Sequence, residues 1–182
     1  MGFVGALAGL GTALALGGWV RWTPPSAVQD LRPSPDALEY EEVGRHVARG
    51  ERFAIVIGGR AYGPAHAPGF PVLLAAYFRF FPDAGPGSSI RVVFACALAA
   101  IAGTWCMGWL AGGPWCGALA GLLIALAPLH VRWSRAVMSD VPSSAAIAWI
   151  GAWSLMALGR RRAGATWLLL GACVGLAVAL LP

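Results

Sequence analysis

Five long apolar runs, separated by polar islands, dominate the pattern of hydrophobic and polar positions along this 182-residue chain. A helix needs about 20 consecutive, mostly apolar residues to cross a membrane. Each run comes close to that length, and none contains Asp, Glu, Lys or Arg. The pattern predicts an all-α protein, a polytopic transmembrane helix bundle of about five spans, at residues 3–20, 92–111, 115–131, 143–159 and 165–182.

Two of these runs need a closer look. The run at 3–20 could instead be a signal peptide, but only the amino terminus supplies the positive charge that such a peptide needs before its apolar part. We therefore favour a span. The run at 115–131 contains Pro128, which frees a backbone carbonyl that the surrounding bundle is expected to satisfy. The pentapeptide GALAG occurs at 5–9 and again at 117–121, a repeat that we attribute to chance in a chain rich in Ala and Gly.

The polar island PSPDALEYEEVGRHVARGERF, residues 33–53, predicts an amphipathic helix. Ser34 suits the N-cap, and Pro35 suits the first helical position. Gly50 can end the helix at its C-terminus. At helical spacing one face carries Asp36, Tyr40, Val43 and Val47. The other faces carry two pairs spaced for ion pairing on a wet surface, Glu41 with Arg45 and Glu42 with His46.

Three ionisable residues attract attention, although each also has a structural explanation. Asp36 lies in the first turn of the predicted helix, where a negative charge favours the helix macrodipole. His66 lies in a Gly- and Pro-rich segment, 60–71, which predicts a structured loop with a solvated histidine. Asp140 shortly precedes Pro142 and the fourth span, so that Ser139 or Asp140 could cap that helix.

The predicted topology places these three residues on one side of the bundle. The arginines at 160–162 indicate a cytoplasmic loop. Counting back across the spans makes 21–90 an external loop, on the same face as 130–142. Within that loop, residues 71–81 are apolar but too few to span, which favours an interfacial or re-entrant helix. Ionisable groups gathered at this depth suggest a functional site.

Composition supports a membrane protein. The chain is 58% hydrophobic and 12% charged, with a mean hydropathy of +0.69, whereas soluble domains carry about 25% charged residues. The net charge of +5 comes from arginine alone. No basic stripe alternates with aromatic residues, which argues against a nucleic-acid partner. The four cysteines lie in apolar runs without metal-ligand spacing and are expected to be small buried hydrophobes.

The order of the polar motifs resembles that of the C-type-fold membrane glycosyltransferases, in particular the protein O-mannosyltransferase and aminoarabinose-transferase-like group. The matching segments are PDALEYEEVGRHVARG, HAPGFPVLLAAYFRFFPD, IRVVFACALAA and LIALAPLHVRWSRAVMSDVPSS. One departure is Ala67-Pro68, where the family has Pro-Pro. The resemblance implies that residues 1–182 form one transmembrane domain, the N-terminal part of a larger glycosyltransferase.

The resemblance also implies an activity. Such enzymes move a sugar from a polyprenyl-phosphate donor to an acceptor hydroxyl on the external face of the membrane, here the bacterial plasma membrane. The acceptor class, whether protein, lipid or glycan, is left open. The chemistry needs a carboxylate base for the acceptor. It also needs cationic groups or a metal for the leaving phosphate.

Site roles follow from the same resemblance. Asp36 matches the acid of the family's first loop and is the expected general base. Tyr40 would orient Asp36 or the sugar, and His66 would contact the donor phosphate or a metal. Asp140 matches the second-loop acid, which would hold acceptor, sugar or metal. A divalent metal would have Asp36, His66 and Asp140 as candidate ligands. The candidate phosphate-binding residues are Arg91, Arg132 and Arg135, because arginine binds phosphate bidentately.

Two other functions remain open at this point. In a non-catalytic scaffold or assembly subunit, the polar loops would only cover the end of the bundle. A transporter would place charges or broken helices at mid-membrane, where this chain has no Asp, Glu or Arg. Geometry separates the enzyme from the scaffold, because an enzyme requires Asp36, His66 and Asp140 to lie together.

Overall fold

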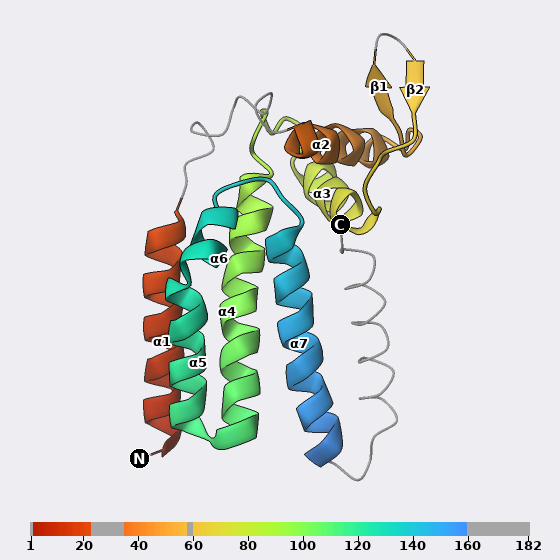
Figure 1. The fold of residues 1–182 in the computed structure, drawn as a ribbon. Helices are drawn as coiled ribbons and strands as arrows, with labels where there is room; N and C mark the ends of the chain where they lie inside the picture. Colours follow the sequence, from red (N-terminus) through yellow and green to blue (C-terminus); the bar gives the residue numbers. More distant parts are fainter. Residues whose placement is uncertain (1, 23–34, 58–59, 160–182) are drawn as a thin grey trace.

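The computed structural model describes residues 2–22, 35–57 and 60–159, and this part of the chain is mostly helical (Figure 1). The predicted fifth span and the Ser34 cap lie outside the described residues. The helices and strands are α1 Gly2–Arg21, α2 Pro35–Ala48, β1 Ile55–Ile57, β2 Arg60–Tyr62, α3 Gly69–Phe80, α4 Ile90–Gly112, α5 Pro114–Leu126, α6 Pro128–Trp133 and α7 Asp140–Gly159.

Helices α1, α4, α5 and α7 stand side by side as a bundle, with α4 packed against the other three (Figure 1). Within the described residues, α4 and α7 are long and apolar enough to cross a membrane. The short α4–α5 turn lies at one end of this bundle. The other end carries the C-terminus of α1, the start of α7, and the helices α2, α3 and α6.

Small residues bring α1 and α5 close together. A Cβ atom added to Gly9 would lie 2.7 Å from the Cβ atom of Ala118, too close for a real contact. Gly9 and Ala118 belong to the two copies of GALAG, so the repeat that we attributed to chance is where these helices touch. Close approach through small side chains is a common way for apolar helices to associate.

The third predicted span, 115–131, is wrong as one continuous helix, because the helix breaks at Ala127. Ala127 has a ψ of 115°, the extended conformation that the following proline favours. Pro128 has no N–H, so the carbonyl of Ile124 loses its usual helical partner. Arg21, at the C-terminus of α1, is 0% exposed and replaces that partner. Its Nη2 atom donates to the Ile124 carbonyl at 2.8 Å, and its Nη1 atom donates to the Ala125 carbonyl.

Helices α2 and α3 lie across this end of the bundle and pack against each other (Figure 1). Their contacts follow the same order along both helices, so the packing is parallel. The rings of Tyr40 and Phe70 lie 5.0 Å apart near the N-terminal ends. At mid-helix Gly44 faces Leu74, and a Cβ atom on Gly44 would come within 2.9 Å of it. A buried apolar cluster joins the pair to the bundle through Tyr40, Phe70, Leu74, Phe78, Ile90, Val93, Val137 and Val141.

A β-hairpin that the all-α prediction missed connects α2 to α3 and projects from the molecule (Figure 1). Its antiparallel strands pair Ile55 with Tyr62 and Ile57 with Arg60. The sequence signal was present: the β-branched run Ile-Val-Ile is followed directly by Gly-Gly, a combination typical of hairpins.

The predicted Glu42–His46 ion pair is also wrong, because both side chains hold the chain that enters the hairpin. Glu42 accepts a hydrogen bond from the Val56 amide at 3.2 Å. The Nδ1 atom of His46 lies 2.9 Å from the Ala54 carbonyl oxygen. These contacts tie β1 to α2.

Glu41 forms its predicted pair with Arg45, at 2.7 Å, but it is buried rather than on a wet face. Its carboxylate accepts hydrogen bonds from the amide of Gly87 and the hydroxyl of Ser89, at the entrance to α4. Arg45 also donates to the Gly85 carbonyl at 3.0 Å. Glu41 therefore fastens α2 to the loop that leads into the bundle.

Glu41→Gln is expected to lower the free energy of unfolding by about 2–4 kcal/mol, since it leaves buried donors and Arg45 without their anionic partner. Thermal unfolding of the purified protein in detergent, followed by tryptophan fluorescence, measures the effect. Glu51→Gln is the matched control, because it removes the exposed partner of Arg49 and should leave Tm unchanged. Equal Tm values for Glu41→Gln and the wild-type protein would contradict the role of Glu41 as a fastener.

Candidate functional site

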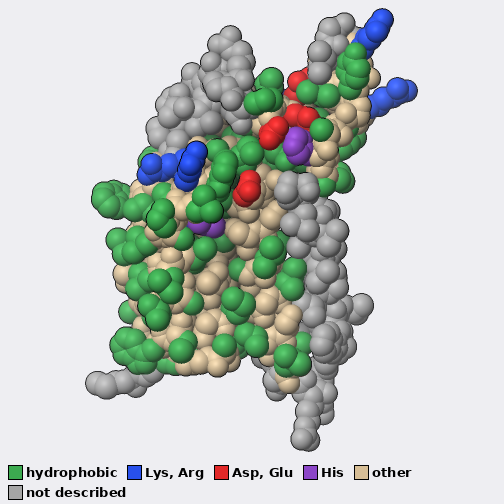
Figure 2. Space-filling view, viewed as in Figure 1, with side chains coloured by type: hydrophobic (Ala, Val, Ile, Leu, Met, Phe, Trp, Pro, Cys, Tyr) green, Lys and Arg blue, Asp and Glu red, His purple; other side chains and the backbone are tan. Residues whose placement is uncertain are grey.

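Three segments far apart in the sequence meet above the end of the bundle. They are the first turns of α2 with Asp36, Glu39 and Tyr40, the loop before α3 with His66, and the start of α7 with Ser139 and Asp140. Tyr40 is buried at their centre, and its ring lies 4.8 Å from the ring of His66. Figure 2 shows acidic side chains gathered beside a histidine near α2, with a further acidic side chain at the top of the bundle.

Glu39 fixes the position of His66. One oxygen, Oε1, accepts hydrogen bonds from the amides of Ala65 at 2.8 Å and His66 at 3.3 Å, and it lies 3.1 Å from Nδ1 of the His66 ring. An ionised carboxylate only accepts hydrogen bonds, so Nδ1 carries the proton in this contact. The other ring nitrogen, Nε2, lies 3.9 Å from Oδ1 of Asp36. The two side chains can thus act on the same bound group.

Tyr40 links this pair to α7. Its hydroxyl lies 3.2 Å from the hydroxyl of Ser139, the residue before Asp140. Burial raises the pKa of Tyr40, the negative charges of Asp36, Asp140 and Glu39 raise it further, and the hydrogen bond to Ser139 acts in the opposite direction. Tyr40 therefore stays a neutral phenol at physiological pH, and both acids of the predicted site lie close enough to act on it.

The geometry brings Asp36, Tyr40 and His66 together directly, and it brings Asp140 to them through Tyr40 and Ser139. The side chain of Asp36 is 48% exposed, and Asp140 is exposed at the start of α7. These acids are accessible to a substrate, whereas Tyr40 behind them is closed to solvent.

The three candidate phosphate-binding arginines lie elsewhere, without contact to Asp36, His66 or Asp140 among the described residues. Arg135 donates through Nε to the Val20 carbonyl at 3.1 Å, which places it beside the end of α1. The guanidinium group of Arg132 lies 5.6 Å from the ring centre of Trp133. Arg91 is exposed at the start of α4, close to the end of α3.

The described residues do not fit the predicted metal site. They contain no group of three His, Cys, Asp or Glu side chains close enough to hold one ion. The Nδ1 atom of His66 is engaged by Glu39, and the link from Asp36 to Asp140 runs through Tyr40. The arrangement is suited instead to proton transfer and hydrogen bonding.

Comparisons with models of protein families, with curated proteins and with solved structures found no match. The functional argument therefore rests on the arrangement of the side chains and on the order of the sequence motifs that carry them.

Sequence reasoning missed two residues of this site and one network beside it. Glu39 was not singled out, and Ser139 was considered only as a helix cap, because each precedes a residue that had drawn attention for its own charge or aromatic ring. The network runs from Arg21 to Nδ1 of His130 at 2.9 Å, and from Nε2 of His130 to the Ser144 hydroxyl at 3.1 Å. It joins α1, α6 and α7 beneath the site. The sequence feature that could have indicated this network is Pro128, which breaks the helix.

Glu39→Ala is expected to loosen the His66 loop, because the amides of Ala65 and His66 lose their common acceptor. Hydrogen–deuterium exchange read by mass spectrometry should show faster uptake in peptides covering 60–68. Glu42→Ala is the control on the same helix, and its increase should fall around Val56 instead. The assignment of Glu39 fails if the two variants give the same exchange map.

Proposed function

We propose that this chain is an integral membrane glycosyltransferase that moves a sugar from a polyprenyl-phosphate donor to an acceptor hydroxyl on the external face. The observation that carries the proposal is the meeting of Asp36, His66 and the Tyr40–Ser139–Asp140 group at one end of an apolar bundle. The order of the motifs around these residues, which resembles that of C-type-fold glycosyltransferases, supplies the reaction class.

In this proposal Asp36 acts as the general base. It takes the proton of the acceptor hydroxyl as that oxygen bonds to the anomeric carbon of the donor sugar, and the bond from that carbon to the phosphate oxygen breaks. The half-exposed carboxylate leaves room for an acceptor to approach. A positioned base of this kind contributes roughly 10²–10⁴-fold to the rate.

His66 and Tyr40 have supporting roles in the same step. With Nδ1 fixed by Glu39, a protonated His66 presents its Nε2–H group to an oxygen of the leaving phosphate, which gains negative charge as the bond breaks. Tyr40, a neutral phenol, holds the start of α7 against α2 and so sets the distance between Asp36 and Asp140. Asp140 is then placed to bind hydroxyl groups of the sugar or acceptor.

The membrane arrangement is part of the proposal. Helices α1, α4 and α7, the broken pair α5 and α6, and residues 165–182 would make up five spans, and α2 and α3 would lie on the external surface. The donor's isoprenoid chain would remain in the bilayer while its phosphate reached the end of the bundle. Two described helices of spanning length support this arrangement.

Asp36→Asn is expected to lower transfer at least 100-fold in membranes that contain the full-length gene product, because the amide cannot accept the proton. Wild type and variants would be assayed against a panel of polyprenyl-phosphate sugars, at matched expression. Asp140→Asn should mainly weaken binding of the donor or acceptor. Glu42→Gln, on the same helix but outside the site, should transfer normally. Full transfer by Asp36→Asn would contradict the role of Asp36 as the base and leave it a structural role at the start of α2. If the wild-type protein transferred sugar from none of the donors, the non-catalytic scaffold would be the better explanation.

The proposed topology makes a separate prediction. In a cysteine-free variant, a cysteine at Ala61 on the hairpin should react with an impermeant maleimide added outside intact cells. A cysteine at Trp115, which is exposed near the α4–α5 turn, should react only after the membrane is opened. Labelling of both positions from the same side would rule out a bundle that crosses the membrane as proposed.

A further inference from the structure

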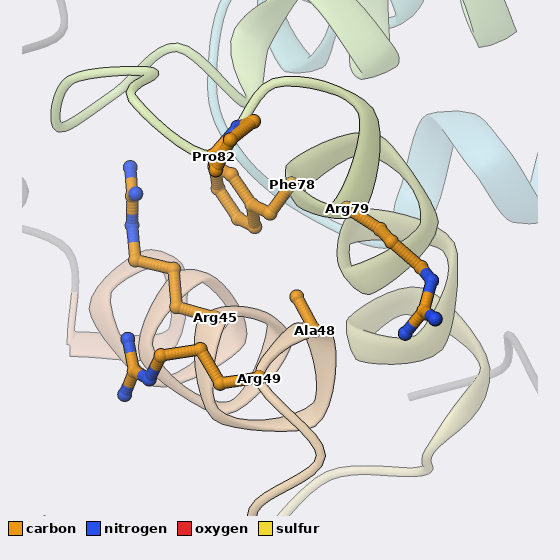
Figure 3. Close-up of a pocket in the computed structure, with 6 residues that line it drawn as sticks. All are labelled: Arg45, Ala48, Arg49, Phe78, Arg79 and Pro82. Carbon is orange, nitrogen blue, oxygen red and sulfur yellow. The ribbon is translucent and has the colours of Figure 1, made fainter.

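A cavity of about 450 Å³ lies at the C-terminal ends of α2 and α3, at the opposite end of this helix pair from Asp36 and His66. Its lining consists of Arg45, Ala48, Arg49, Phe78, Arg79 and Pro82. In Figure 3 Arg45 and Arg49 extend from α2 on one side, Arg79 extends from α3 on the other, and Ala48, Phe78 and Pro82 lie between them. The cavity thus has an apolar floor and positively charged sides.

The charges around this cavity do not cancel. Arg45 pairs with Glu41 at 2.7 Å, and Arg49 pairs with Glu51 through its Nε atom at 2.6 Å. Arg79 has no ion-pair partner within the part of the chain that the structure describes. Three arginines against two glutamates leave one positive charge, which matches the single negative charge of a phosphodiester.

Apolar surface continues from the cavity to the end of α3. Phe80 is 80% exposed and Phe81 is 54% exposed, and both line a second cavity of about 330 Å³. Pro82 lines both cavities. Aromatic and arginine side chains of this kind gather where a protein meets the boundary between lipid tails and headgroups. A free phosphate ion has no apolar part that could contact the floor of the cavity or the adjoining phenylalanines.

We propose that the cavity between the C-terminal ends of α2 and α3 binds the headgroup of an anionic glycerophospholipid. The phosphodiester lies against Arg79, which extends from α3 on the other side from Arg45 and Arg49, and the glycerol backbone lies over the exposed Pro82. Phe80 and Phe81 then contact the upper part of the acyl chains. This site is separate from the proposed transfer site and does not depend on that activity.

Lipid titration of the purified full chain tests the proposal. Thermal unfolding in detergent would be followed by tryptophan fluorescence while phosphatidylglycerol, phosphatidylcholine or inorganic phosphate is added. Phosphatidylglycerol should raise Tm saturably, and the other two should not at the same concentration. An equal effect of phosphatidylcholine would overturn recognition of the charge, and an equal effect of inorganic phosphate would reduce the site to one for free phosphate.

Arg79→Gln should weaken the phosphatidylglycerol effect about tenfold in apparent Kd, because it removes one charge-assisted contact. Arg60→Gln is the matched control, since it removes an exposed arginine on the hairpin, away from the cavity. Arg45 is unsuitable for this test because Glu41 depends on it. Equal weakening by Arg60→Gln would show diffuse attraction to the whole surface and overturn the site.

Phe80→Ser separates a lipid from a phosphate alone. It should weaken phosphatidylglycerol binding while all three arginines stay in place, and native mass spectrometry of the lipid-bound protein provides an independent readout. Unchanged phosphatidylglycerol binding by both Phe80→Ser and Arg79→Gln would overturn the proposal.

Discussion

The attachment of α2 to the bundle depends on the buried carboxylate of Glu41. Three groups donate hydrogen bonds to it, the guanidinium of Arg45, the amide of Gly87 and the hydroxyl of Ser89, and the guanidinium of Arg45 in turn lies over the ring of Phe78. A carboxylate removed from water needs such partners, because an unpaired buried charge is costly. The next residue back in the chain is Tyr40, so the same anchor determines where the centre of the candidate site lies.

A second constraint acts at the break between α5 and α6, where backbone carbonyl groups need hydrogen-bond partners among apolar helices. In a membrane every backbone carbonyl needs a partner from the protein itself. The break between α5 and α6 removes the amide that would normally bond to the Ile124 carbonyl, which keeps a 3.4 Å bond from the Ala127 amide, and the buried guanidinium of Arg21 donates to the carbonyls of Ile124 and Ala125. The broken helix lets His130 turn toward Ser144 and α7. The end of the bundle that carries the site is therefore held together by side-chain hydrogen bonds as well as by packing.

Much of the helical architecture could be predicted because apolar runs and helix signals are local. Pro35 begins α2, and Gly50 follows its end with a positive φ of 75°. The apolar segment before Pro82 forms α3, which begins two residues earlier than expected. The hairpin was missed because its strands have only three residues each and its Gly-Gly signal adjoins a Gly- and Pro-rich segment that was expected to be a loop.

The partners of each polar residue could not be predicted, because they come from distant segments. Glu39 binds a loop 27 positions further along the chain, and Glu41 reaches the entrance of α4. Local spacing instead suggested helical ion pairs, of which only Glu41–Arg45 forms. Asp36, Tyr40 and His66 were singled out from motif order, and their closeness is a property of the parallel packing of α2 and α3. The three arginines expected to join them are spread over other parts of the same end of the protein.

Parallel packing of α2 and α3 gives this pair two chemically different ends. Side chains at the N-terminal end are acidic, and the hydroxyl groups of Tyr40 and Ser139, 3.2 Å apart, join this end to the start of α7. At the C-terminal end, arginine and phenylalanine side chains face outward. Because Gly44 lets the two helix backbones approach closely, both ends belong to one packed pair of helices. The packing that places Asp36 beside His66 therefore also determines where the arginine side chains emerge at the other end.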